Sequence, residues 1–165
     1  MIPGVLITAD AAALLARLQD AHGPLMFHQS GGCCDGSSPM CYPLGDFLVG
    51  DRDVLLGVLD IPGPQGAQAV PVWISGPQYQ AWKHTQLVID VVPGRGGGFS
   101  LEAPEGLRFL SRGRVYSEDE KALVEAVPVI TGAAYERGER PSIRGSVVRC
   151  NDIDNAPGTC PIPGR

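Results

Sequence analysis

Hydrophobic residues recur with a helical period near the start of the chain. Between residues 8 and 22, Leu14 and Leu18 lie on the same side of a helix, and the charged residues lie on the other side. Thr8 is the expected N-cap residue, and Gly23 stands where a helix commonly ends. The pattern therefore predicts an amphipathic helix over residues 8–22.

Short runs of β-branched and aromatic residues, separated by turn-forming residues, follow this helix. Such runs are typical of strands. The predicted strands cover residues 25–29, 46–49, 53–60, 69–74, 85–92, 99–102 and 107–116. Pro71 favours an edge position or a bulge for its strand, because proline cannot donate a hydrogen bond to a neighbouring strand.

The glycine-rich segment 93–98 joins two of the predicted strands. We expect it to close a β-hairpin between residues 85–92 and residues 99–102. A phosphate-binding loop is the alternative interpretation. It is disfavoured because such loops open onto the N-terminus of a helix, whereas a strand is expected here.

Two further helices and the order of the elements indicate the fold class. Ser75 with Pro77 marks the start of a short helix that ends near His84, and residues 117–120 form a capping box that opens a helix through Glu125. Helices interspersed with short strands predict an α+β fold with a mostly antiparallel sheet or a small barrel. We expect one domain over residues 1–126 and a Pro- and Gly-rich C-terminal extension over residues 127–165, which packs on the body, packs on a partner or stays partly mobile.

The composition narrows the classes of partner. A chain of 165 residues with 44% hydrophobic content is long enough to bury a core. The net charge of −5 disfavours a nucleic-acid partner, although Arg108, Arg112 and Arg114 form a local basic cluster. No apolar run approaches the ~20 residues that cross a bilayer, and no basic region precedes the first apolar stretch. We therefore expect a cytoplasmic protein without a membrane partner, whose cysteines are thiols or metal ligands.

Candidate chemistry is concentrated between Phe27 and Cys41. This stretch holds three of the five cysteines and one of the three histidines among glycines and serines that allow tight turns. Thiolates and imidazoles together suit a soft transition metal such as Zn or Cu. The candidate metal ligands are Cys33, Cys34, Cys41, His28 and His84. The cysteine spacing is irregular for a structural zinc site, because two cysteines are adjacent and the third lies seven positions on.

The same residues allow other interpretations, and these stay open. The adjacent Cys33 and Cys34 are suited to reversible disulfide formation. One thiol could instead act as a nucleophile with His28 or His84 as its base. The cysteines could also be inert and pack as small hydrophobic side chains. No nucleotide cofactor is predicted.

Two long motifs give the chain a family resemblance. The stretch from Phe27 to Cys41, together with the stretch from His84 to Glu102, resembles a bacterial family known as domain of unknown function 779. The resemblance extends from about Leu14 to Glu125. Members of that family are often encoded beside aldehyde or alcohol dehydrogenases, so the resemblance implies a role in aldehyde metabolism, and it assigns no catalytic residue.

Three functions follow from these observations as hypotheses. The first is a cytoplasmic accessory protein that binds a soft metal ion through the candidate ligands. The second is a thiol-dependent enzyme or redox protein that uses the adjacent cysteines. The third is an interaction module that binds an aldehyde or alcohol dehydrogenase or associates with a second copy of itself.

Overall fold

The computed structural model describes residues 2–30, 38–63, 66–95 and 99–141, together with the backbone of residues 144–145 and 147–148. The strands are β1 (Val5–Thr8), β2 (Leu25–Gln29), β3 (Met40–Pro43), β4 (Val54–Ile61), β5 (Gln68–Ile74), β6 (Thr85–Pro93), β7 (Leu107–Val115), β8 (Ile130–Thr131), β9 (Arg144–Gly145) and β10 (Val147–Val148). The helices are α1 (Ala9–His22), α2 (Gly76–Trp82), α3 (Glu118–Glu125) and α4 (Gly132–Glu136), with a 3-10 turn, η1 (Ala103–Glu105).

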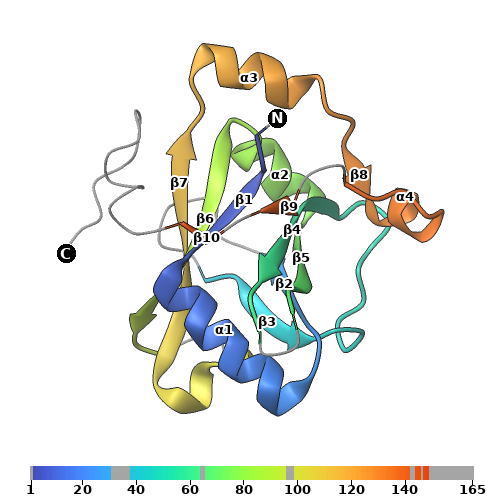
Figure 1. Cartoon of the computed structure of the whole chain (residues 1–165). Helices are drawn as coiled ribbons and strands as arrows, with labels where there is room; N and C mark the ends of the chain where they lie inside the picture. Colours follow the sequence, from blue (N-terminus) through green and yellow to red (C-terminus); the bar gives the residue numbers. More distant parts are fainter. Residues whose placement is uncertain are drawn as a thin grey trace.

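These elements form two open sheets with mixed strand directions (Figure 1). One sheet has the strand order β10-β1-β6-β7, and the other has the order β3-β2-β5-β4-β8, with β9 also paired to β4. The longest ladders, β6 with β7 and β4 with β5, are antiparallel, whereas β1 pairs in parallel with β6 and β10. The predicted α+β class is confirmed.

The predicted N-terminal helix is confirmed as α1, and its ends follow the sequence signals. The Thr8 side chain accepts a hydrogen bond from the backbone N–H of Ala11, as an N-cap residue does. Gly23 has φ +80°, a conformation that costs glycine little, and its N–H donates to the Gln19 carbonyl. The buried side of α1 includes Leu14 and Leu18.

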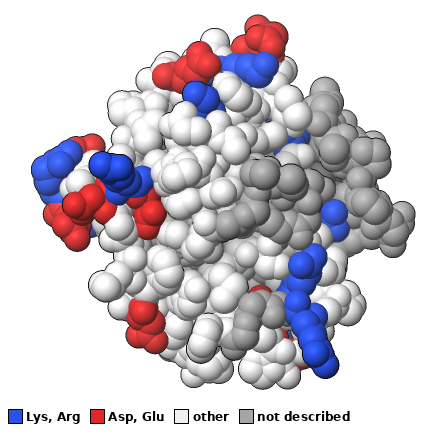
Figure 2. All heavy atoms as spheres, turned by 180° about the vertical axis from the view of Figure 1, so that it is seen from behind, with Lys and Arg blue, Asp and Glu red and all other residues white. Residues whose placement is uncertain are grey.

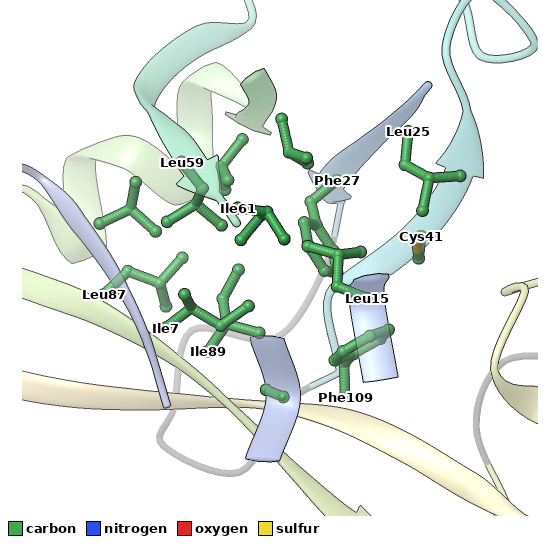
Figure 3. Close-up of a cluster of buried hydrophobic side chains, with 14 of the residues drawn as sticks. Ile7, Leu15, Leu25, Phe27, Cys41, Leu59, Ile61, Leu87, Ile89 and Phe109 are labelled. Carbon is green, nitrogen blue, oxygen red and sulfur yellow. The ribbon is translucent and has the colours of Figure 1, made fainter. Parts of the chain in front are cut away.

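The core lies between the two sheets and against α1 (Figure 3). Side chains from one sheet, such as Ile89 of β6, face side chains from the other, such as Leu59 of β4, and Leu15 of α1 adds to them. The rings of Phe27 and Phe109 join the sheets edge to face, with centroids 4.9 Å apart.

Of the two predicted positions for the strand that contains Pro71, the edge is wrong, and a bulge is present in one of its ladders. β5 lies inside its sheet, between β2 and β4. Proline is tolerated there because the pairing of β5 with β2 covers only Val72, Trp73 and Ile74, so Pro71 lies just before it. The ladder to β4 contains Pro71, and it has a bulge between Leu55 and Gly57.

Two short predicted strands are absent. Residues 46–49 lie in the irregular connection between β3 and β4, directly after the turn at Gly45, which has φ +95°, and Leu48 is 91% exposed. Residues 99–102 form turns that lead into η1, so the antiparallel partner of β6 is β7. The alternation at 99–102 misleads because its buried side chains are Ser100 and Glu102, while Phe99 is 88% exposed.

Segments at both ends of the chain contribute strands that the sequence analysis did not predict. β1 is central in its sheet, between β10 and β6. In the predicted C-terminal extension, β8 and β9 pair with β4, and β10 pairs with β1. Tyr135 of α4 packs edge to face on Trp73, with ring centroids 5.3 Å apart. The segment after residue 126 therefore takes part in both sheets.

Charged side chains gather in a few groups on the face seen in Figure 2, and uncharged residues separate them. Two arginines of the basic cluster are paired with carboxylates: Arg112 Nε donates to Asp90 Oδ2 over 2.9 Å, and Arg114 pairs with Glu120.

In the part of the chain that the structure describes, every helix is too short or too polar to cross a bilayer.

Candidate active site

His28 lies near the end of β2 and is almost completely buried, with 3% of its surface exposed. Successive side chains of a strand point to opposite faces, and Phe27 points into the core between the sheets. His28 therefore points to the outer face of its sheet, where it packs on the ring of Phe47 with centroids 4.3 Å apart. Trp73, its partner in the ladder with β5, belongs to the hydrophobic cluster on that face.

Both ring nitrogens of His28 have hydrogen-bond partners. Nε2 lies 2.9 Å from Oδ2 of Asp53, and Nδ1 lies 2.6 Å from Oγ of Ser30. A carboxylate can only accept a hydrogen bond, so Nε2 carries a proton, and in the neutral ring Nδ1 then accepts the proton of the serine hydroxyl. The three side chains therefore form one continuous chain, from hydroxyl to imidazole to carboxylate.

Asp53 is held in place by the turn that precedes β4. Its Oδ2 also accepts a hydrogen bond from the backbone N–H of Gly50 over 2.9 Å, and its own N–H donates to the Gly50 carbonyl. Its carbonyl accepts from the N–H of Gly132 at the start of α4. The carboxylate side chain is 16% exposed, so it is shielded from solvent and fixed in direction toward His28.

Ser30 is exposed, in contrast to the two residues behind it. It lies two positions after His28, directly before the glycine and cysteine stretch that contains Cys33 and Cys34. These two cysteines lie outside the described residues. At the far end of that stretch, Ser38 accepts a hydrogen bond from Arg108 over 3.0 Å. The buried imidazole of His28 is thus connected to the protein surface by the hydroxyl group of the exposed Ser30.

Cys41 lies on the other face of the same sheet. It pairs with Phe27 in the ladder between β2 and β3, and its side chain is fully buried in the core cluster. Burial raises the pKa of the Cys41 thiol well above its ordinary value, and the negative charge of Glu102 raises it further. His28 and Cys41 are thus separated by the sheet and cannot bind one ion together.

Glu102 forms a second buried polar group behind Cys41. It is fully buried and accepts hydrogen bonds from the Ser100 hydroxyl and from the backbone N–H of Phe109. The Ser100 hydroxyl in turn accepts from the N–H of Cys41 over 2.9 Å. This arrangement secures the turn at residues 99–102 to β3, and we assign it a structural role.

His84 lies in another part of the molecule. It is exposed at the junction between α2 and β6, and its carbonyl accepts from the N–H of Tyr116. Gln29, the neighbour of His28, accepts a hydrogen bond from the hydroxyl of Ser111 in β7. Thr85, the neighbour of His84, pairs with Val115 at the other end of this stretch of β7. Ser111 and Val115 are separated by roughly 14 Å along the strand, at ~3.4 Å per residue.

The predicted metal ligands are therefore not brought together within the described residues. His28 faces outward, Cys41 faces the core, and His84 lies at the end of another sheet. Within residues 2–30, 38–63, 66–95 and 99–141, no three His, Cys, Asp or Glu side chains form a group that could hold an ion. Because Cys33 and Cys34 lie outside these ranges, a centre that combines them with His28 stays a prediction.

Sequence analysis identified His28 but missed its two partners. Ser30 lies in the cysteine-rich stretch, and its position two residues after His28, directly after the strand, was the available signal. Asp53 had none, because it follows His28 by 25 positions and is brought to it by the pairing of β5 with both β2 and β4.

The fold and the site define an α+β protein of two mixed sheets, in which a buried histidine connects a carboxylate to an exposed serine at the end of a strand. The chain belongs to the family described as Domain of unknown function (DUF779), whose model matches residues 14–115. That range contains His28, Ser30 and Asp53. No curated protein and no solved structure matches the chain. The role in aldehyde metabolism and the dehydrogenase partner stay predictions.

Proposed function

We propose that the protein is an enzyme of nucleophilic chemistry that acts on activated carbonyl compounds, such as esters or thioesters. The observation that supports this function is the chain of hydrogen bonds from the exposed Ser30 hydroxyl through His28 to Asp53, over 2.6 and 2.9 Å. A nucleophile within hydrogen-bond reach of a base that a third group orients is the arrangement that activates a serine hydroxyl.

Each of the three residues has one role in the proposed reaction. Ser30 Oγ forms a bond to the carbonyl carbon while its proton passes to His28 Nδ1. The Asp53 carboxylate accepts the hydrogen bond from Nε2–H and stabilises the positive charge of the protonated ring. His28 then returns the proton to the leaving group, which departs as an alcohol or thiol. Water hydrolyses the acyl–serine and restores the hydroxyl.

The experiment is covalent labelling with a fluorophosphonate, a reagent that modifies activated serines. We expect mass spectrometry to place one adduct on Ser30. Asp53→Asn should slow the labelling by about 10²-fold or more, because the amide no longer fixes the tautomer of His28. Ser38→Ala is the matched control, since Ser38 lies in the same region and bonds Arg108 instead of a base.

Two results would contradict the enzyme proposal. One is the absence of an adduct on Ser30 after prolonged incubation of the folded wild-type chain. The other is a labelling rate in Asp53→Asn that equals the wild-type rate while circular dichroism shows that the variant is folded. Ser30→Ala should abolish the adduct. It should lower the free energy of unfolding by no more than about 1 kcal/mol, since Ser30 is exposed.

The contact between His28 and Asp53 also favours soft-metal binding as a second candidate function. Histidines that bind metals commonly donate their other N–H to a carboxylate. In this function Nδ1 binds the ion in place of the Ser30 hydroxyl, and Cys33 and Cys34 supply thiolates. Metal analysis of the purified chain tests it: Asp53→Asn should weaken Zn²⁺ binding about 10- to 100-fold. Bound Zn²⁺ should also suppress the labelling of Ser30, which separates the two functions.

A further inference from the structure

A pocket of about 410 Å³ is lined by the N-terminus, β4, α2, α3, the residues that lead into β8 and those that follow α4. This volume is within the range of small-molecule sites, roughly 300–1,000 Å³. Most of the lining side chains are apolar, among them Ile2, Leu56, Trp82, Val124, Val127 and Ile130. The pocket can therefore take up the apolar part of a small molecule.

α3 borders this pocket and packs little on the body of the protein. It has no buried residue, and Val124, which lines the pocket, is only half-buried. In Figure 1, α3 lies above α2 and the N-terminus, connected by extended segments at both ends. The ion pair between Arg114 and Glu120 connects it to the end of β7. A ligand in the pocket therefore adds apolar contacts to a helix that has few.

Three of the lining residues are charged at neutral pH, two positively and one negatively. The negative charge of Glu139 is compensated by Arg137, which pairs with it over 3.3 Å. The Lys83 ammonium donates to the neutral amide oxygen of Gln80, and Arg140 donates to backbone carbonyls. Among the residues that the structure describes, neither cation pairs with a carboxylate. Positive charge is thus in excess at this pocket, in a chain whose net charge is −5.

The guanidinium group of Arg140 is fixed by two hydrogen bonds and one aromatic ring. Its Nη1 donates to the carbonyl oxygens of Tyr135 and Glu139, each over 2.7 Å, and its central carbon lies 3.6 Å from the centroid of the Tyr135 ring. These contacts use both N–H groups of Nη1 and one face of the guanidinium plane. Within the described part of the chain, no hydrogen bond engages the parallel N–H groups of Nε and Nη2. Two parallel donors fit the two oxygens of a carboxylate.

We infer that this pocket binds an amphipathic carboxylate, such as the anion of a medium-chain fatty acid. The apolar tail contacts the lining, and the carboxylate accepts hydrogen bonds from Nε and Nη2 of Arg140. Lys83 adds a second positive charge to the same pocket. The inference is independent of the enzyme proposal, because the pocket includes neither His28 nor Ser30. It also depends on residues beyond position 115, where the family model ends.

The test compares three probes that share one alkyl chain, octanoate, octanol and octylammonium, by calorimetric titration of the unmodified protein. At pH 8 octanoate is ionised and octylammonium is protonated. We expect octanoate to bind at least about tenfold more tightly than octanol, because a charge-assisted pair is added to the same apolar burial. Octylammonium should bind more weakly than octanol, because the cations of the pocket repel it. Equal affinities for octanoate and octanol would overturn the inference.

Substitution of Arg140 locates the carboxylate. Arg140→Gln should weaken octanoate binding about tenfold or more and should change octanol binding by less than about twofold, which shows that the pocket is intact. Arg17→Gln is the matched control for net charge, since Arg17 is exposed on α1 and does not line the pocket. Equal weakening in these two variants would contradict the assignment. So would a preference for octanoate that Lys83→Gln removes and Arg140→Gln retains.

Substitutions on α3 locate the apolar tail. Val124→Phe should weaken the binding of both octanoate and octanol about tenfold, because the larger ring occupies the pocket. Leu123→Phe is the matched control, since Leu123 is 52% exposed on the same helix and does not line the pocket. Equal weakening by the two substitutions would place the tail elsewhere and overturn the inference.

Discussion

At the scale of the residue, chemistry in this chain is decided by the strand face on which a side chain lies. Cys41 and His28 are candidate partners in the sequence and are neighbours in one ladder, yet the alternation of strand side chains separates them. The sequence identified the stretch that contains both. It could not give their faces, because the register between β2 and β3 is set by contacts outside that stretch.

The burial of Cys41 predicts a protected thiol. We expect iodoacetamide to leave Cys41 unmodified in the native protein at pH 8, because the side chain is fully buried and its raised pKa disfavours the reactive thiolate. Peptide mapping after labelling, with and without guanidinium, measures this. Modification in the unfolded state is the control, and rapid labelling of Cys41 in the native state would contradict the described placement.

The burial of Tyr116 predicts a dependence of stability on alkaline pH. Burial raises the pKa of this phenol from 10 to about 12, so folding favours the neutral form. A raised pKa contributes stability that is complete below the ordinary value of 10 and is lost as the pH rises through the folded value. We therefore expect the free energy of unfolding to fall between pH 10 and pH 12.

Two measurements check this. Absorbance at 295 nm should show a late tyrosine ionisation that is missing in Tyr116→Phe. Chemical denaturation should show a smaller loss of stability between pH 10 and pH 12 in that variant than in the wild type. Tyr135→Phe is the control, because it removes a phenol from another part of the molecule, where Tyr135 packs on Trp73. A late ionisation that persists in Tyr116→Phe would show that another tyrosine is the buried one.

At the scale of the element, local signals predicted the helices better than the short strands. The ends of α1 follow Thr8 and Gly23, and Ser117 accepts from the N–H of Glu120 as the capping box predicts. These signals act within a few residues, so they can be read directly from the sequence. Residues 46–49 contain three apolar residues in a row, but no described strand pairs with them, and an apolar run without a partner does not make a strand.

The ion pair between Arg114 and Glu120, which attaches α3 to β7, predicts a local effect of acid. Glu120 accepts hydrogen bonds from Arg114, and these lower the pKa of its carboxyl below the ordinary value of 4.5. A lowered pKa contributes stability that is present above the ordinary value and is lost as the pH falls through the folded value. We expect α3 to loosen below about pH 4.5 while the sheets stay protected.

Hydrogen exchange of the α3 amides measures this loosening. Glu120→Gln should raise their exchange about two- to fivefold at neutral pH and should remove most of the acid dependence. Glu118→Gln is the matched control, since Glu118 lies in the same turn and pairs with the neighbouring Lys121 on the same helix. Equal effects of the two substitutions would contradict the role of the contact between Arg114 and Glu120.

At the scale of the whole molecule, the sheets depend on pairings between distant segments. β1 pairs with β6, which begins 80 positions after it in the chain, and β10 pairs with β1 from near the other end. The sequence predicted most of the strands and the α+β class because periodicity is local. It could not predict the mixed strand order, because that order follows from which long-range contacts bury the most apolar surface.

The same long-range pairings make the role of the C-terminal segment testable. A chain that ends at residue 126 lacks β8, α4, β9 and β10, so it exposes the edges of β1 and β4 and uncovers Trp73, which is 3% exposed in the whole chain. We expect it to be less stable than the full chain by at least about 2 kcal/mol in chemical denaturation, with a red-shifted tryptophan emission. A chain that ends at Val148 retains every described strand and is the control, and its midpoint should lie above that of the shorter chain. If the two truncated chains unfold at the midpoint of the full protein, residues 127–148 add nothing to the body, and residues 1–126 fold as an independent unit.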